Sequence, residues 1–369
     1  MNPTARVSVG QTDICVPRLG LGTTALGNMF EAVPDRDATA VIDRAFQLDL
    51  GYFDTAPVYG LGLAEKRLSH GVRGHTRDEY VLSTKVGRLL RAGAPPEQNL
   101  MPDGQPLFVE TPPVNPIFDF SYDGAMRSLE ESLERLHIDR ADIVFIHDPD
   151  NHFEEALGGA YRALSDLKRQ GVIRAIGVGI NQAELLVRFA HAAEFDCFLL
   201  ANRYTLLDNQ VTLRELLPLC VRKHISLIIG GVYNSGILAN PVPGAKYKYA
   251  RADDDILART LQLKAVCDRY GVPLKAAAIQ FPLLHPAVAS VIVGMRSVAE
   301  LDENAAMMRV DIPIDLWQEL RTEGLIPFEA PVPPPMRLGC SSGNWTTLPS
   351  VPDNAWIMGD MVLFCAGSM

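Results

Sequence analysis

The sequence predicts an α/β protein in which eight parallel strands close into a single (β/α)8, or TIM, barrel. Eight short apolar runs alternate along the chain with amphipathic helical segments. Most of these runs are almost continuously apolar, as expected for parallel strands that are buried on both faces. Because the strands are separated by helices, a closed barrel fits the pattern better than an α+β arrangement does. The eight predicted strands are residues 18–23, 52–56, 80–86, 141–148, 174–181, 197–204, 226–233 and 289–295.

Helical periodicity is plain in several of the intervening segments. Among them are residues 37–51, 121–138 and 154–171. In the second of these the apolar side chains fall on one face at helical spacing, and they are Ala125, Leu129, Leu133 and Leu136. Three glycines follow helical runs, where a left-handed residue commonly ends a helix; they are Gly51, Gly171 and Gly271.

Three segments and a tail do not follow the alternation. Residues 3–17 are typical of a short hairpin that plugs the bottom of the barrel, and a long loop follows strand three at 88–120. A second long loop follows strand seven at 234–252, and loops of this length in a compact domain are usually functional. We therefore expect the barrel to occupy residues 1–330, followed by a non-barrel tail at 331–369. From about residue 338 the tail is expected to be dispensable for catalysis, or else its apolar run packs on a partner subunit.

Composition and charge exclude several function classes. The net charge of −10, from 34 basic and 44 acidic residues, repels a polyanion and argues against nucleic-acid binding. No apolar run is long enough to span a bilayer, and the N-terminus lacks the apolar core of a secretory signal. The six cysteines show neither a CxxC pair nor metal-ligand spacing. We expect a cytoplasmic protein with reduced thiols and no metal site, acting as a monomer or a homo-oligomer.

Four reactive side chains are predicted at the carboxyl ends of neighbouring strands, where barrel enzymes place their active sites. Asp54 ends strand two and Tyr59 follows in its loop, while Lys85 ends strand three and His147 ends strand four. These residue types suit a proton transfer coupled to a hydride transfer. A tyrosine is a weak base near neutral pH, but a neighbouring ammonium lowers the pKa of its hydroxyl, and a carboxylate holds that ammonium in place. The histidine would then orient the substrate oxygen.

The motifs around these residues resemble the aldo-keto reductase superfamily over about residues 16–310. The resemblance is carried by GYFDTAPVYG, YVLSTKVG, IVFIHDPD and IGVGIN. It implies that Asp54, Tyr59, Lys85 and His147 form the family's catalytic tetrad. The segments RYTLLDNQ and GGVYNSGIL further resemble the branch that contains aldose 1-dehydrogenases and pyridoxal 4-dehydrogenase.

The resemblance also implies a nicotinamide cofactor, although no GxGxxG fingerprint follows the first strand. Asn181 corresponds to the family's ligand of the nicotinamide carboxamide. Three neighbours depart from the family pattern: Ile180 replaces a serine, Ala201 replaces a glutamine that also holds the amide, and Gly230 replaces an aromatic residue that stacks on the ring. Either the contacts to the nicotinamide are fewer than usual, or residues such as Arg203 or Tyr233 supply them.

The segment VGMRSVAELDENAAM resembles the family's site for the adenosine and pyrophosphate. Gly294 allows close backbone approach, the following helix N-terminus suits a phosphate, and Glu303 and Asn304 match the pair that contacts adenine. NADP-dependent members often carry an arginine where this chain has Glu300, so the resemblance implies NAD rather than NADP, with Arg296 as a competing influence. The expected cofactor-binding residues are Gly22, Thr23, Asn181, Asn234, Ser235, Gly236, Gly294, Met295, Arg296, Glu300, Glu303 and Asn304.

The resulting hypothesis is an NAD-dependent dehydrogenase that oxidises a cyclic hemiacetal, such as a fucose- or galactose-type aldopyranose, to a lactone. Tyr59 would remove the hydroxyl proton while the hydride leaves the carbon. Two alternatives within enzymes stay open: oxidation of pyridoxal to its lactone, and reduction of a general aldehyde or ketone. A third alternative, from another class, is a cofactor-binding regulatory module with little turnover.

Overall fold

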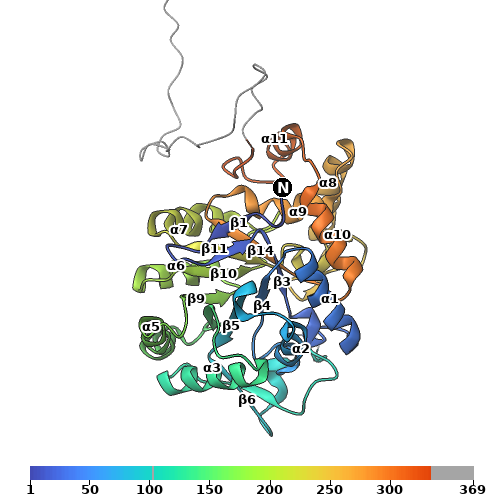
Figure 1. The fold of residues 1–369 in the computed structure, drawn as a ribbon. Coiled ribbons are helices and arrows are strands. Elements are labelled where there is room, and N and C mark those ends of the chain that lie inside the picture. The colour runs from blue at the N-terminus through green and yellow to red at the C-terminus, as the bar shows by residue number, and fades with distance from the viewer. Residues whose placement is uncertain (102–103, 334–369) are drawn as a thin grey trace, which may run out of the picture. The chain divides into compact units, whose positions relative to one another are not determined.

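The computed structural model describes residues 1–101 and 104–333, and its central feature is a closed barrel of eight parallel strands. The strands follow the order β3-β4-β5-β8-β9-β10-β11-β14, and β14 pairs with β3 to close the ring. Figure 1 shows the helices arranged around these strands. The barrel strands are β3 Leu19–Gly22, β4 Tyr52–Asp54, β5 Val81–Val86, β8 Ile143–His147, β9 Ala175–Ile180, β10 Cys197–Ala201, β11 Ser226–Gly230 and β14 Val288–Gly294.

All eight predicted strands are therefore confirmed, but two of them end three residues earlier than predicted. The run 197–204 leaves the sheet after Ala201, and the run 226–233 leaves it after Gly230. In both cases the next residue has a left-handed backbone, with φ 62° at Asn202 and φ 63° at Gly231. A left-handed residue cannot continue a strand, so the chain turns into the barrel mouth at these two points.

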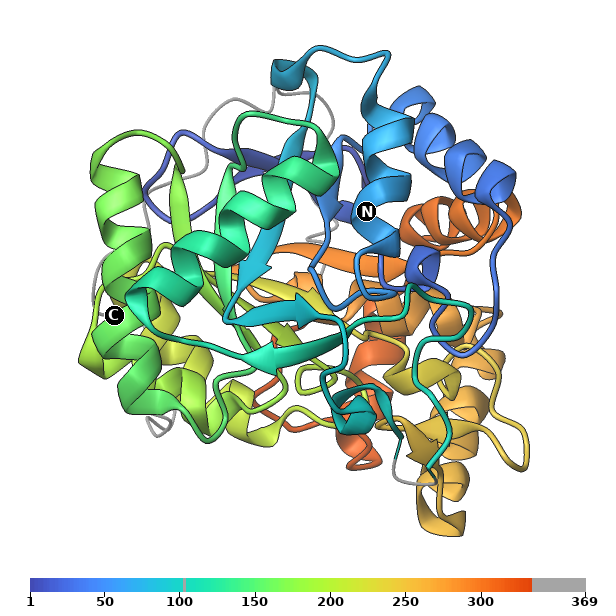
Figure 2. The same cartoon turned by 90° about the horizontal axis from the view of Figure 1, so that it is seen from below.

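The helices cover the outside of the barrel, as the view in Figure 2 also shows. They are α1 Asp35–Gln47, α2 Leu63–Val72, α3 Tyr122–Leu136, α4 Phe153–Glu155, α5 Arg162–Arg169, α6 Ala183–Ala192, α7 Leu217–Lys223, α8 Asp254–Arg269, α9 Leu274–Gln280, α10 Val298–Arg309 and α11 Ile314–Thr322. Wider π turns join α4 to α5 and precede α7, at Ala156–Tyr161 and Thr212–Leu216. Short 3-10 turns lie at Ala25–Gly27, Arg77–Glu79, Pro96–Asn99, Asn234–Gly236 and Pro282–Leu284.

One of the three glycine predictions is wrong. Gly171 and Gly271 are left-handed, with φ of 76° and 66°, but the left-handed residue after α1 is Asp49, with φ 57°. Gly51 serves a different purpose: a Cβ there would lie 3.0 Å from the backbone oxygen of Glu79. The glycine therefore allows two chain segments to approach closely rather than ending the helix.

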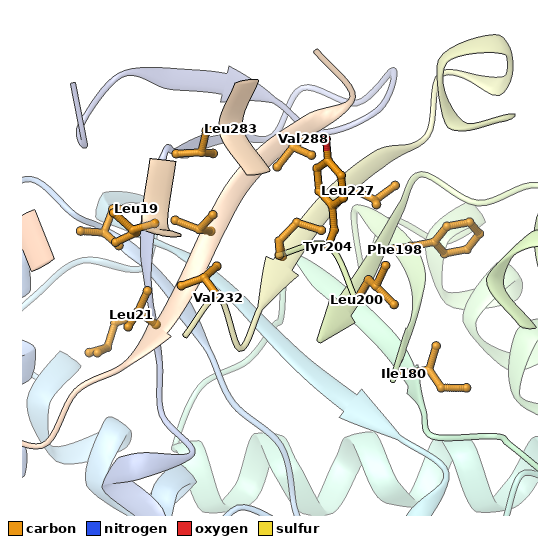
Figure 3. Close-up of a cluster of buried hydrophobic side chains, with 14 of the residues drawn as sticks. Leu19, Leu21, Ile180, Phe198, Leu200, Tyr204, Leu227, Val232, Leu283 and Val288 are labelled. Atoms are coloured by element: carbon orange, nitrogen blue, oxygen red, sulfur yellow. The ribbon is translucent and has the colours of Figure 1, made fainter. Parts of the chain in front are cut away.

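Alternate residues of each strand divide the core into two layers. On β10, Phe198 and Leu200 face the helices, while Cys197 and Leu199 belong to the cluster inside the barrel. Figure 3 shows part of the outer layer, including Phe198 and Leu200. Strands covered on both faces require apolar residues at nearly every position, which explains the continuous apolar runs of the sequence.

The predicted N-terminal plug is confirmed. The strands β1 (Arg6–Ser8) and β2 (Cys15–Pro17) pair antiparallel, and the hairpin buries Val9, Ile14 and Val16 completely. These three side chains share a cluster with the first residues of several barrel strands, including Tyr52, Val81, Ile143, Ala175 and Cys197. The hairpin therefore covers the amino end of the barrel and leaves the carboxyl end for the site.

Each of the two long loops contains a small antiparallel hairpin. The first contains β6 (Arg88–Arg91) and β7 (Asn115–Phe118), and the second contains β12 (Lys246–Tyr247) and β13 (Ala250–Arg251). The sequence did not predict these strands, because each is too short to show a periodic pattern.

Residues Met1–Pro333 form one compact unit. Apart from its first three residues, the tail expected at 331–369 lies outside the described residues, so its boundary and its dispensability stay predictions. Cys340 and Cys365 also lie there, and the four cysteines of the described part are free thiols. No helix within the described ranges is long and apolar enough to cross a membrane.

Candidate active site

A cavity of about 710 Å³ opens at the carboxyl ends of the barrel strands. Every strand contributes at or next to its last residue, through Gly22, Asp54, Lys85, His147, Ile180, Ala201, Gly230 and Gly294. Both long loops add to the wall. The cavity therefore lies where a barrel enzyme binds its substrate. Its volume is large enough for a small molecule together with one half of a dinucleotide.

Asp54 and Lys85 form a buried ion pair at the bottom of this cavity. The Lys85 Nζ lies 2.7 Å from the Asp54 Oδ2 and donates a second hydrogen bond of 2.8 Å to the backbone oxygen of Thr55. The other Asp54 oxygen accepts a hydrogen bond of 2.7 Å from Ser83. Burial opposes the charge on Lys85, but the negative charges of Asp54 and Tyr59 outweigh it, so its pKa lies above the ordinary value. The ammonium therefore stays charged and fixed in place.

Tyr59 stands over this pair. The Lys85 Nζ lies 4.6 Å from the centroid of the Tyr59 ring. Burial raises the pKa of the Tyr59 hydroxyl, and the charge of Lys85 lowers it by less, so the pKa lies above its ordinary value. The ammonium therefore lowers the pKa of Tyr59 as predicted, but the net shift is upward, because removal from water costs the phenolate more than Lys85 returns.

His147 completes the set as a neutral imidazole. Burial lowers its pKa well below the ordinary value, and the charges of Arg88 and Lys85 lower it further. Its ring stands edge-on to that of Tyr59, with the centroids 5.9 Å apart. The buried Nδ1 has no hydrogen-bond partner among the described residues, while Nε2 lies 3.4 Å from the Asp148 carboxylate. A neutral imidazole in this position is able to donate one hydrogen bond to a substrate oxygen.

The structure thus brings all four predicted catalytic residues together in one cavity. It divides the expected cofactor residues into two groups. Those that line the cavity are Gly22, Asn181, Ser235, Gly236, Gly294, Arg296, Glu300, Glu303 and Asn304. Thr23, Asn234 and Met295 are fully buried behind the wall. Thr23 donates to the Asp54 backbone oxygen at 3.0 Å, and Asn234 donates to the Asn202 backbone oxygen at 3.2 Å, so both shape the site without lining the cavity.

At one end of the cavity a single cation is held by two carboxylates. The Arg296 guanidinium contacts Glu300 at 3.0 Å and Glu31, from the loop before α1, at 2.5 Å. The backbone amide of Arg296 also donates to Glu300 at 2.8 Å. Ser297 caps α10 by accepting a hydrogen bond from the Glu300 amide. The side chains of Arg296, Glu300 and Glu31 together carry a net negative charge. The backbone amides at the start of α10, in contrast, are oriented to bind an anion.

Beside it, the expected adenine pair is held by a residue of α9 and by a residue of the turn after β11. Glu303 forms an ion pair of 2.5 Å with Lys275, and Asn304 accepts a hydrogen bond of 2.5 Å from the Tyr233 hydroxyl. Tyr233 lines the cavity, whereas Arg203 pairs with Asp208 outside it. Of the two neighbours suggested for the nicotinamide, only Tyr233 is therefore in reach of a ligand.

The sequence prediction missed Asn202, which lines the cavity next to Asn181. Its Nδ2 lies 3.4 Å from the Asn181 Oδ1 and 3.1 Å from the Tyr249 hydroxyl. A Cβ at Gly231 would lie 2.5 Å from the Asn202 Oδ1, so only glycine leaves room for this amide. An asparagine directly after a strand was the available signal, because asparagine tolerates the left-handed backbone that Asn202 adopts.

Four more residues of the cavity wall come from the two long loops and from the end of β8. Arg88 and Asp148 form an ion pair of 2.7 Å, and Phe108 and Tyr249 line the same space. Arg88 and Phe108 come from the first long loop, and Tyr249 comes from the second. No periodic pattern marks such residues in the sequence.

A model of the aldo/keto reductase family matches residues 18–322. This chain belongs to that family. It is 40% identical to pyridoxal 4-dehydrogenase of Microbacterium luteolum, over 86% of this chain and 97% of the relative. It is also 40% identical to D-threo-aldose 1-dehydrogenase of a Pseudomonas species, over 85% and 96% of the two chains. An aldo-keto reductase of Bacillus halodurans has the same fold, with a TM-score of 0.68 and 24% identity over 86% of this chain and 95% of that one.

Aldo-keto reductases are oxidoreductases that use nicotinamide cofactors, and the residues of this cavity fit such a group. Gly230 leaves open space, since a Cβ there would still stand 3.5 Å from the nearest atom, the Ala201 Cβ. The helix start at Ser297 offers amides to a phosphate, and the side-chain amides of Asn181 and Asn202 face the same part of the cavity. No group of three or more His, Cys, Asp or Glu side chains in the described ranges is placed to hold a metal ion.

Proposed function

We propose that this protein is an NAD-dependent dehydrogenase that oxidises the cyclic hemiacetal form of an aldose to a lactone. The observation that carries the proposal is the position of Tyr59 over the buried Asp54–Lys85 pair, in a chain that is 40% identical to an aldose 1-dehydrogenase. The arrangement supplies a proton acceptor beside a fixed positive charge, which is what oxidation of an anomeric hydroxyl requires.

In the forward reaction Tyr59 takes the proton of the anomeric hydroxyl. The electron pair of that O–H bond forms the C=O bond of the lactone, while the hydrogen on the same carbon leaves with its electrons. The nicotinamide, when bound, accepts this hydride. Lys85 stabilises the Tyr59 phenolate that must exist before the proton is taken, and Asp54 holds Lys85 in place. Neutral His147 donates a hydrogen bond to the substrate oxygen and so fixes the carbon toward the cofactor.

The preference for NAD rests on the charges around Arg296. An arginine that faces a ribose 2′-phosphate supports NADP, but here Glu300 and Glu31 already neutralise the guanidinium. A carboxylate about 4 Å from a phosphate charge costs roughly 4 kcal/mol at an effective dielectric constant of about 20. Solvent screening reduces this to an amount that still corresponds to about a tenfold preference. Glu300 is also able to accept a hydrogen bond from the free ribose hydroxyl.

Oxidation of pyridoxal to its lactone is the second candidate, because the pyridoxal 4-dehydrogenase relative is equally similar. Both substrates are cyclic hemiacetals in solution, so the same proton and hydride transfers apply. A reducing compartment such as the cytoplasm suits the four free thiols of the described part.

A panel of substrates tests the proposal. Fucose, galactose, pyridoxal and simple alcohols are each mixed with NAD and with NADP, and the appearance of reduced nicotinamide is followed. Simple aldehydes are mixed with NADH and with NADPH, and the disappearance of reduced nicotinamide is followed. Turnover of an aldose with NAD is the expected result. Turnover of pyridoxal alone would establish the second candidate, and reduction of aldehydes alone would favour a general reductase. Tight cofactor binding without turnover of any compound would indicate the regulatory module.

A further inference from the structure

The turn between β12 and β13 has an unusual backbone. It consists of two residues, Lys248 and Tyr249, and both are left-handed, with φ of 50° and 68°. Two-residue hairpin turns of this kind strongly prefer Asn-Gly, because side chains with a bulky Cβ are strained there. Strain of this sort persists only where the surrounding structure enforces it, and it gathers at functional sites.

Three contacts hold the turn over the cavity. The Tyr249 amide donates a hydrogen bond of 2.9 Å to the Ser235 Oγ, and Lys248 forms an ion pair of 2.7 Å with Asp208. At the start of the hairpin, the Lys246 Nζ lies 3.7 Å from the centroid of the Phe30 ring, on the other side of the mouth. The turn is therefore anchored to the body of the protein at both ends.

The side chain that this turn delivers to the cavity is that of Tyr249. It lines the cavity together with Tyr59, and the charge of an ionised Tyr59 raises its pKa, so the two side chains interact electrostatically. Its hydroxyl oxygen accepts a hydrogen bond of 3.1 Å from the Asn202 Nδ2. The hydroxyl hydrogen finds no acceptor within the described ranges. Burial raises the pKa of Tyr249 to about 12, so the hydroxyl keeps this hydrogen near neutral pH.

Opposite the polar groups the wall is apolar. The Phe108 ring centroid lies 6.4 Å from that of Tyr59, and Phe30, Val58 and Leu61 line the same cavity. A ring-shaped substrate that reaches Tyr59 with its reacting oxygen would therefore face carbon on one side. On the other side it would face polar groups, among them the Tyr249 hydroxyl with its spare proton.

We propose that Tyr249 is a specificity-determining residue that donates a hydrogen bond to a second oxygen of the substrate, one or two carbons from the reacting carbon. Asn202 orients the hydroxyl by donating to it, which leaves the Tyr249 hydrogen for the substrate. The inference rests on the proposed function for its substrate class. Tyr249 would select hemiacetals that carry a neighbouring hydroxyl, such as the 2-hydroxyl of an aldose or the 3-hydroxyl of pyridoxal, over analogues that lack this hydroxyl.

The test compares wild type with Tyr249→Phe on matched pairs of compounds: galactose with 2-deoxygalactose, and pyridoxal with 3-deoxypyridoxal. For the hydroxylated member we expect KM to rise about tenfold in the variant, as for loss of one buried hydrogen bond, with kcat within about twofold. For the deoxy member KM should hardly change. The NADH dissociation constant of the free protein should also be the same in both proteins.

Tyr247→Phe is the matched control, because Tyr247 belongs to the same hairpin but does not line the cavity. It should behave as wild type throughout. An equal rise in KM for both members of a pair would mean that Tyr249 acts through packing, and no rise for either would mean that it makes no hydrogen bond. Either result would overturn the inference.

A separate measurement distinguishes this failure from failure of the proposed function. If the wild type turned over none of the four compounds, the proposed function would fail. The role of Tyr249 would still be testable by isothermal titration calorimetry, which measures how the four compounds bind to the NADH-loaded protein. A tenfold loss of affinity in Tyr249→Phe, confined to the hydroxylated members, would support the inference. The inference would be rejected if the ratio of the affinities for the hydroxylated and the deoxy member were the same in wild type and variant. It would also be rejected if no member bound.

Discussion

Lys85 and Asp54 come from adjacent barrel strands and meet in a hydrogen bond of 2.7 Å, with neither side chain more than 1% exposed. A buried ammonium without a partner would either lose its proton or move toward solvent. The pair exists because β4 and β5 run side by side and both end at the same edge of the barrel. In the proposed mechanism it provides the fixed charge that stabilises the Tyr59 phenolate.

Tyr59→Phe should lower kcat by about 10²–10⁴-fold, the range typical of losing general acid–base catalysis. The dissociation constant for NADH should stay close to the wild-type value, because only the hydroxyl is removed. Steady-state kinetics and fluorescence titration of the cofactor check the two parts. Tyr122→Phe, at an exposed tyrosine that bonds to Asp166, is the control. A variant that kept more than about a tenth of the wild-type kcat would refute the proposed role.

Lys85→Met should slow oxidation and move the rising limb of the pH–rate profile, where Tyr59 loses its proton, to higher pH. Burial already raises the pKa of Tyr59, and Lys85 works against that rise. Without the ammonium the pKa must therefore increase further, so more alkaline solution is needed to form the phenolate. The measurement is kcat/KM for oxidation across the pH range over which the variant stays folded.

The folded state of Lys85→Met needs its own check, because Asp54 would be left as a buried carboxylate without its cation. Such a loss typically costs about 3–5 kcal/mol, so thermal unfolding should be followed at each pH. A slower enzyme whose rising limb has not moved would show that Lys85 only supports the structure.

The ratio of kcat/KM with NAD to that with NADP should favour NAD by about tenfold, and two substitutions should lower it. Glu300→Arg replaces a repelling carboxylate with a cation, and Glu31→Gln removes one of the two carboxylates that neutralise Arg296. The second variant is the more specific test, because Glu31 lies far from α10 in the sequence and acts on Arg296 only through the ion pair that the structure shows. Glu329→Gln, which breaks an exposed pair with Arg214, serves as the control. A wild type that used both cofactors equally would contradict this explanation of the site.

Acid should destabilise the protein partly through His285. Burial lowers the pKa of this histidine from 6.5 to about 4, and its Nδ1 accepts a hydrogen bond of 3.1 Å from the Ala287 amide. Above pH 6.5 the imidazole is mostly neutral in both the folded and the unfolded chain. Below pH 6.5 this histidine takes up a proton in the unfolded chain, whereas in the folded chain it stays neutral until about pH 4. The free energy of unfolding therefore falls as the pH drops from 6.5 to about 4. The loss at about pH 5 is roughly 2 kcal/mol.

His285→Gln should therefore lose less stability than the wild type between neutral pH and about pH 5. Urea denaturation at the two pH values measures the difference. The pKa of His147 is lowered by burial as well, so both proteins share its contribution and only the difference reports on His285. Substitution of the exposed His70 by Gln is the control. Equal losses in wild type and His285→Gln would mean that His285 is not the group responsible.

The sequence alone was sufficient to predict the barrel and the meeting of Asp54, Tyr59, Lys85 and His147 in one cavity. The apolar runs identify the strands because burial on both faces demands them. Asp54, Lys85 and His147 each end such a run, and parallel neighbours in a barrel bring those ends to one mouth. Local pattern and global topology agree at these positions. That the segment from Gly294 to Asn304 lines the cavity was also predictable, since it is one continuous stretch at the end of the last strand.

Tertiary structure alone decided which residues complete the site. Glu31 reaches Arg296 across 265 positions of sequence, Asn202 enters the cavity by a left-handed turn, and Tyr249 arrives on a two-residue hairpin turn. The upward net shift in the pKa of Tyr59 was missed for a related reason, because spacing indicates which charge lies near a hydroxyl but not how completely the hydroxyl is removed from water. Irregular loops carry no hydrophobic period, and their positions follow from contacts between distant segments. Such contacts form only once the barrel has brought those segments together.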